Sequence, residues 1–192
     1  MQSPNAPSQI TPIDWAKRLK ADTEEIHQEA ESKGIFKRLF NPDLTLSDYS
    51  CFLADLYARL APIEIEILRS SDLTKLPSVQ SRITFPALSQ DIKYFGINPP
   101  SLGGPFPISG LGSLVGTLYV LEGSAHGGCI FHKHLLNHLS ITESTGLAYF
   151  STQAQSVHTR FKAFREEINQ LLDENHYNEA LATAKLTFQR FL

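Results

Sequence analysis

Cysteine is scarce in this chain of 192 residues. Its two cysteines, Cys51 and Cys129, are far apart and form no metal-ligand or redox spacing. Such sparse thiols argue against a disulfide framework and favour reduced cysteines in a cytoplasmic protein. An excess of charge of either sign is also lacking, since the formal net charge is -3. This balance argues against electrostatic binding to nucleic acid or to a membrane surface.

Long apolar runs and leader signals are absent as well. No stretch reaches the roughly 20 apolar residues that a membrane span requires. The segment MQSPNAPSQITP has no basic region followed by an apolar core, so it is not a secretory signal. We therefore expect residues 1–12 to be a flexible lead-in and residues 13–192 to form one helical domain.

Strand-like alternation with hairpin turns is missing, and apolar residues instead recur at spacings of three and four. This periodicity predicts an all-α, single-domain multi-helix bundle of six to eight helices. The expected helices cover residues 14–32, 47–69, 113–139, 152–173 and 177–191, with one or two short ones in 70–112.

One candidate site lies in the stretch LKADTEEIHQEAE. Leu19, Thr23, His27 and Glu31 are each four residues apart and form one helical stripe. His27 is thus expected to point with the apolar face, where a neutral imidazole can ligate a metal while Glu31 accepts its other N–H. The alternative is a structural histidine with a carboxylate partner one turn on.

A second candidate site lies in the stretch YVLEGSAHGG, which places three glycines inside an expected helix. Each costs roughly 1 kcal/mol relative to alanine. Gly116, Gly123 and Gly127 point in nearly one direction, with Ser124 and Gly128 beside them. A helix face without side chains admits a flat ligand. The alternative is a close helix–helix crossing over small residues.

Together the two stretches resemble the heme oxygenases, particularly the bacterial type found with bacteriophytochromes. The family's first pattern, Leu-Lys-x-x-Thr-x-x-x-His-x-x-x-Glu, matches Leu19, Lys20, Thr23, His27 and Glu31. Its second pattern, Tyr-x-Leu-Glu-Gly-Ser-x-x-Gly-Gly, matches Tyr119, Leu121, Glu122, Gly123, Ser124, Gly127 and Gly128. The order of the motifs and their separation agree with the family from about residue 13 to residue 192.

The resemblance implies a heme-degrading monooxygenase. Heme is then both cofactor and substrate, and O₂ opens it to biliverdin, carbon monoxide and Fe²⁺. His27 is the proximal ligand of the heme iron, while Gly123, Ser124 and Gly127 form the distal wall. The chain has no flavin, nicotinamide or iron–sulfur motif, so the electrons come from an external donor. The family implies a ferredoxin or a reductase as that donor, and a phytochrome is a possible acceptor of the product.

The resemblance also assigns basic residues to the heme propionates. Lys20 matches the family's basic position in the first helix, and Arg160, Lys162 and Arg165 lie where the family places further contacts. We rank Lys162 first among these three. Tyr119 either bonds a propionate or packs. The alternative for the three C-terminal cations is an ordinary solvated helix face.

Two positions depart from the family pattern. Ser124 stands where animal members carry an aspartate; a hydroxyl can hold water but carries no charge. His126 stands where a small or apolar residue is expected. It either faces outward or toward the heme edge, or swings over the iron and competes with O₂.

Two rival functions follow from these departures and from the helical scaffold. If His126 ligates the iron, the chain is a heme-binding sensor or carrier without turnover. A di-iron bundle is the other rival, but it requires several Glu-x-x-His pairs, and Glu24 with His27 is a single one.

Overall fold

The computed structural model describes residues 13–80 and 82–192. Within these residues it contains α-helices and short 3-10 helices and no β-strand, which confirms the all-α prediction. The α-helices are α1 (Trp15–Asp22), α2 (Glu24–Lys33), α3 (Leu46–Arg69), α4 (Phe85–Tyr94), α5 (Leu111–His138), α6 (Ala148–Ala154), α7 (Val157–Leu171) and α8 (Glu174–Arg190). The expected lead-in, residues 1–12, lies outside the described residues.

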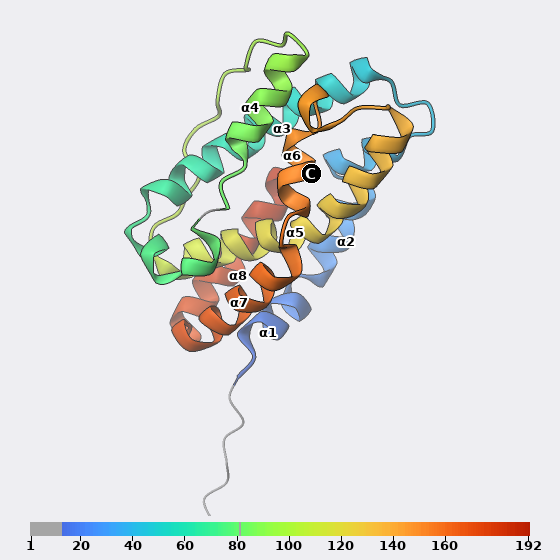
Figure 1. Cartoon of the computed structure of the whole chain (residues 1–192). Helices are drawn as coiled ribbons and strands as arrows, with labels where there is room; N and C mark the ends of the chain where they lie inside the picture. Colours follow the sequence, from blue (N-terminus) through green and yellow to red (C-terminus); the bar gives the residue numbers. More distant parts are fainter. Residues whose placement is uncertain (1–12, 81) are drawn as a thin grey trace, which may run out of the picture.

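Helix α5 is the central element of the bundle. It packs most extensively against α8, and α6 and α7 also lie against it (Figure 1). Every residue from Leu111 to Glu122 is buried, whereas the second half of the helix alternates between buried and accessible positions. The first half of α5 is therefore core, and the second half borders a space.

Two of its glycines explain how α5 approaches α8 so closely. A Cβ added at Gly116 would lie 2.0 Å from the backbone oxygen of Ala180 on α8. One added at Gly112 would lie 2.6 Å from the backbone oxygen of His176. For Gly116 the alternative of a close helix crossing is thus correct, and this residue belongs to the core.

The first expected helix is interrupted. Thr23, with φ −112° and ψ 2°, separates α1 from α2. Its hydroxyl donates to the Leu19 carbonyl at 2.7 Å, as does its own backbone N–H at 3.0 Å. A threonine hydroxyl that competes for backbone carbonyls in this way disturbs a helix. His27 therefore stands on a separate helix of ten residues.

The expected helix over residues 152–173 is also two helices in the structure. Ser156 adopts a left-handed conformation, with φ 54°, between α6 and α7. A non-glycine residue is uncommon in this region, and the pattern of apolar residues gives no warning of it. The break frees α6 to pack on α5 independently of α7.

Asp91 fixes the start of α6. This fully buried carboxylate accepts hydrogen bonds from the backbone N–H groups of Ala148 and Tyr149, each at 2.8 Å. Burial raises the pKa of Asp91 to about 6, while the two backbone donors oppose that shift. The first turn of α6 is thereby tied to α4, which carries Asp91.

Among the described helices, none combines the length with the apolar character needed to cross a bilayer.

Candidate functional site

A cavity of about 660 Å³ lies beside the second half of α5. Its volume falls within the range of about 300–1,000 Å³ that is usual for small-molecule sites. The opposite wall comes from α2 and from the 3-10 helix η1 (Ile35–Phe40), and α6 and α8 add further residues. The space that the glycine face predicts is present, and the two segments have not collapsed onto each other.

The wall formed by α2 carries His27. Its side chain is 46% exposed, and Nε2 lies 3.4 Å from Oε1 of Glu31 one turn on. The ring packs against Phe188 of α8, with centroids 5.3 Å apart. Both His27 and Glu31 line the cavity. The imidazole is therefore accessible to a ligand, supported from behind and next to an acceptor.

The wall formed by α5 is nearly bare at two glycines. A Cβ added at Gly123 would meet nothing within 4 Å, and one at Gly127 would meet only Phe131, at 3.8 Å. Ser124 also lines the cavity and donates its hydroxyl to the Leu121 carbonyl at 2.8 Å. No neighbouring helix requires glycine at positions 123 and 127, so the space beside them is available to a ligand.

Gly128 has a different environment. It lines the cavity, but a Cβ added there would lie 2.9 Å from Cβ of Gln153 on α6. This glycine lets α6 approach α5.

Alanine substitution is expected to affect stability with opposite signs along this helix. Gly116→Ala should lower the free energy of unfolding by about 1–3 kcal/mol, because its Cβ meets the α8 backbone. Gly123→Ala should raise it by about 0.5–1 kcal/mol, because helix propensity improves and nothing is displaced. Urea denaturation of the ligand-free variants measures both values. Destabilisation by Gly123→Ala would mean that the glycine is structural.

Polar groups also line the cavity. Among them are Lys20, Thr23 and Tyr119. Burial raises the pKa of the Tyr119 hydroxyl. The hydroxyl is thus a neutral donor in a cavity that a lysine also lines, and both groups are suited to an anionic group on a ligand.

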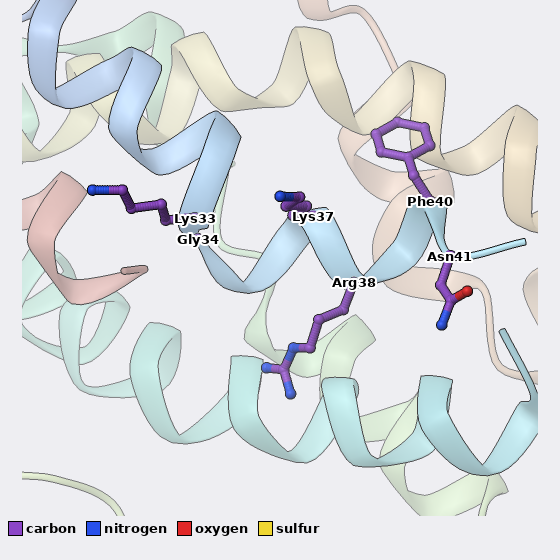
Figure 2. Close-up of a pocket in the computed structure, with 6 residues that line it drawn as sticks. All are labelled: Lys33, Gly34, Lys37, Arg38, Phe40 and Asn41. Atoms are coloured by element: carbon purple, nitrogen blue, oxygen red, sulfur yellow. The ribbon is translucent and has the colours of Figure 1, made fainter. Parts of the chain in front are cut away.

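A second lysine, Lys37 of η1, also lines the cavity, and the sequence motifs gave no indication of it. Figure 2 shows Lys37 together with Phe40 on the α5 side of η1, while Arg38 extends toward α3. Arg38 forms an ion pair with Asp55 there. These side chains border a separate shallow hollow of about 420 Å³ that also includes Lys33, Gly34 and Asn41.

The three C-terminal cations that the resemblance assigns to an anionic ligand do not line the cavity. Arg160 pairs with Glu122, with Nε 2.6 Å from Oε2. Arg165 pairs with Asp14 at 2.8 Å, and Lys162 is exposed. The structure therefore brings Lys20 to the cavity and leaves these three on the α7 side.

His126 lines the cavity at its α7 side. Its ring packs against His158 and Phe161, each with centroids 5.1 Å away. Nδ1 lies 3.3 Å from the Gly123 carbonyl. These contacts with α7 hold the His126 ring at the edge of the cavity.

A buried ion cluster lies directly before Gly123 in the sequence. Glu122 is fully buried and pairs with Arg82, whose Nε is 2.5 Å from Oε1, and with Arg160. Arg82 also reaches Glu64 of α3 at 3.2 Å and donates to the Leu121 carbonyl at 2.8 Å. This cluster joins α5 to α3, to α7 and to the segment before α4. It fixes the backbone next to the bare wall.

Sequence reasoning also missed most of the aromatic lining. It comprises Phe36, Phe40, Phe131, Tyr149, Phe150, Phe161, Phe188 and Phe191. The segment IFKRLF carries the only visible signal, with aromatic residues on both sides of a lysine. Apolar cavity residues look like core residues in a sequence, because both follow the helical period.

The described residues contain no group of three or more histidine, cysteine, aspartate or glutamate side chains that could hold a metal ion by themselves. Glu24 with His27 accordingly has no second carboxylate–histidine pair gathered around it. The structure gives the di-iron alternative no support in the part of the chain that it describes.

Comparison with known proteins agrees with the resemblance seen in the motifs. The family model described as heme oxygenase matches residues 13–97. No curated protein sequence matches the chain. Among solved structures, the heme oxygenase from Neisseria meningitidis, with NO and CO bound, has a TM-score of 0.77 at 23% identity. The match covers 93% of this chain and 88% of that one.

The heme oxygenase from Leptospira interrogans has a TM-score of 0.74 at 21% identity, covering 93% of this chain and 96% of that chain. The chain therefore has the heme oxygenase fold. Both comparisons agree with the resemblance that the two motifs carry.

Proposed function

We propose that this chain, which has the heme oxygenase fold and matches the family model, binds heme in its cavity and opens it oxidatively. The products would be biliverdin, carbon monoxide and Fe²⁺. The observation that carries this proposal is the 660 Å³ cavity between an accessible imidazole and two glycines with empty space at the Cβ position. When bound, heme supplies an iron that activates O₂ and is itself the substrate.

His27 is the residue suited to hold the iron. A neutral imidazole ligates through one nitrogen, and an acceptor at the other raises its basicity and fixes the ring. Glu31, whose Oε1 lies 3.4 Å from Nε2, is placed to be such an acceptor. Phe188 packs against the imidazole and limits its rotation.

Gly123 and Gly127 are suited to the face where O₂ binds. Their missing side chains leave room for a flat ring and a small ligand on it, and the carbonyl and amide groups of α5 stay close. Ser124 adds a hydroxyl that can hold water on this face. The aromatic residues around them exclude bulk water.

The carboxylates of heme fit the cations of the cavity. Lys20 and Tyr119 offer a charge and a neutral hydroxyl, and Lys37 offers a second charge. Exposed pairs of this kind are worth about 0–1 kcal/mol each, so they orient the ring more than they retain it. We give Arg160, Lys162 and Arg165 no contact with heme in this proposal.

Turnover needs electrons from outside the chain, and we assign them to a ferredoxin or reductase of the cytoplasm. A phytochrome is the proposed acceptor of biliverdin. Both assignments extend the bacterial resemblance of the motifs.

The test is a spectrum of the purified chain mixed with hemin, first without and then with ascorbate or a reductase in air. An enzyme binds hemin with a Soret band, then loses that band as biliverdin absorption grows. Hemin left intact under reducing, aerated conditions would contradict turnover.

The same spectra address the alternative of a heme-binding homologue without turnover. His126 favours this alternative because it lines the cavity. A stable low-spin spectrum that His126→Ala converts to high spin would establish the alternative. The contacts of His126 with His158 and Phe161 favour the enzyme, since they hold the ring at the edge.

A further inference from the structure

Two histidines from neighbouring helices meet at the α7 side of the cavity. His126 of α5 lines the cavity, whereas His158 of α7 is exposed. Their ring centroids are 5.1 Å apart, with 66° between the ring planes. Phe161, which also lines the cavity, packs against His126 at the same distance. The two imidazoles therefore connect the cavity with the surface of the molecule.

The separation of the two rings fits one metal ion between them. An imidazole nitrogen binds a divalent transition metal at about 2.0–2.1 Å, which places the centre of the ring about 3.2 Å from the metal. Two such rings at a tetrahedral angle have their centres about 5 Å apart. The observed 5.1 Å agrees with this value. Because His158 is exposed, its ring can turn to present a nitrogen to the ion.

The hydrogen bonding of His126 prepares its ring as a ligand. Nδ1 lies 3.3 Å from the Gly123 carbonyl, which can only accept, so Nδ1 carries the proton and donates it. Nε2 of the neutral ring then keeps the lone pair that a metal requires. Histidines that ligate metals commonly donate their other ring nitrogen to a carbonyl or carboxylate, which fixes the tautomer. His126 has this arrangement without any metal in its surroundings to impose it.

The pair suits an ion that passes through rather than a resident metal. Within the described residues, no group of three histidine, cysteine, aspartate or glutamate side chains forms a closed metal site. Two imidazoles completed by water bind borderline metals such as Fe²⁺ but hold them less firmly than three or four protein ligands do. Arg160, two residues after His158, does not oppose a cation strongly, since its charge is paired with Glu122 at 2.6 Å.

We propose that His126 and His158 form the exit site for the Fe²⁺ that leaves the cavity after heme is opened. This inference rests on the proposed function, which releases one Fe²⁺ for each heme. His126 takes the ion from the opened ring at the edge of the cavity by exchange of ligands, without oxidation or reduction. His158 then passes the ion to solvent. The imidazole at position 126 thereby has a role that needs no bond to the iron of intact heme.

The first experiment adds Co²⁺ to the ligand-free chain and follows the imidazole signals by NMR. Co²⁺ is paramagnetic and stable in air and takes the same ligands as Fe²⁺, so the affected signals identify the histidines that bind it. His126 and His158 should respond together at the lowest Co²⁺ concentration. His158→Ala should weaken Co²⁺ binding at His126 at least about tenfold, because even the hydrogen-bond partner of a metal ligand is worth about 10- to 100-fold in affinity.

His134→Ala is the matched control for His158→Ala. His134 stacks on His138 with centroids 5.3 Å apart, so the two form a second histidine pair, but both belong to α5 and neither lines the cavity. This control should leave the response of His126 and His158 to Co²⁺ unchanged. Co²⁺ binding that His134→Ala abolishes and His158→Ala leaves intact would overturn the proposal.

The second experiment compares ring opening with iron release in a single turnover, with a coloured chelator of Fe²⁺ in solution. In His158→Ala, biliverdin should appear at the parental rate, because His158 is exposed and does not line the cavity. Fe²⁺ should reach the chelator several-fold more slowly than in the parent. Release at the parental rate would refute the exit site and leave the proposed function intact. A parent chain that does not open hemin would refute the proposed function and with it the source of the iron.

Discussion

His27→Ala is expected to abolish biliverdin formation and to replace the axial-imidazole spectrum of the bound hemin. The imidazole lines the cavity opposite the bare glycines and is the side chain of α2 that fits iron. Without it, bound heme would have no neutral nitrogen ligand from α2 to support O₂ binding. The absorption spectrum of the hemin complex and its turnover with ascorbate measure both effects.

Three companion measurements make the His27 result specific. Free imidazole added to His27→Ala should restore part of the spectrum and of the turnover, because the created space accepts it. Glu31→Gln, which alters only the acceptor 3.4 Å from Nε2, should lower heme affinity or turnover by about tenfold at most. His27→Ala with His126→Ala should resemble the single variant if His126 is not a ligand. Normal biliverdin formation by His27→Ala would refute the ligand assignment.

The second large effect is expected from the buried ion cluster. Arg82→Ala removes the cation between Glu64 and Glu122, both fully buried. Breaking a buried pair from one side costs about 3–5 kcal/mol, because a carboxylate remains desolvated without its partner. Glu64 keeps the Thr84 hydroxyl and backbone donors, which moderates the loss. Chemical denaturation of the ligand-free protein measures it.

Arg38→Ala is the matched control for Arg82. Arg38 also pairs with a carboxylate of α3, Asp55, but the two side chains are 51% and 32% exposed. Exposed pairs contribute about 0–1 kcal/mol, so this variant should be almost as stable as the parent. Equal losses from Arg82→Ala and Arg38→Ala would show that burial of the cluster does not govern its energetics. Arg82→Ala should also weaken hemin binding, since Glu122 directly precedes Gly123.

The helical class and the two facing motifs could be predicted from the sequence because both depend on local spacing. Apolar residues at spacings of three and four place α3 correctly to within one residue of its expected start. The helix begins at Leu46, after the cap Thr45, and Asp48 completes the capping box. The interruptions at Thr23 and Ser156 could not be predicted in the same way. They depend on one hydroxyl and one backbone angle, which leave the apolar pattern unchanged.

The glycines of α5 show what the spacing of residues in the sequence cannot predict. Gly116 and Gly123 lie on nearly the same face, yet one meets the α8 backbone and the other meets open space. Only the position of a neighbouring helix separates these two environments. Arg160 is a similar case, because the resemblance assigns it to the ligand while its partner Glu122 lies 38 residues away in the sequence.

The Glu122 cluster makes the α5 wall of the cavity sensitive to substitutions in other segments of the chain. The α5 backbone beside the cavity is held in place by arginines contributed by the segment before α4 and by α7. Substitutions in those distant segments should therefore change how closely this backbone approaches the cavity. Relatives in which a neutral residue replaces Arg82 or Arg160 should also lack an acidic residue at the position of Glu122.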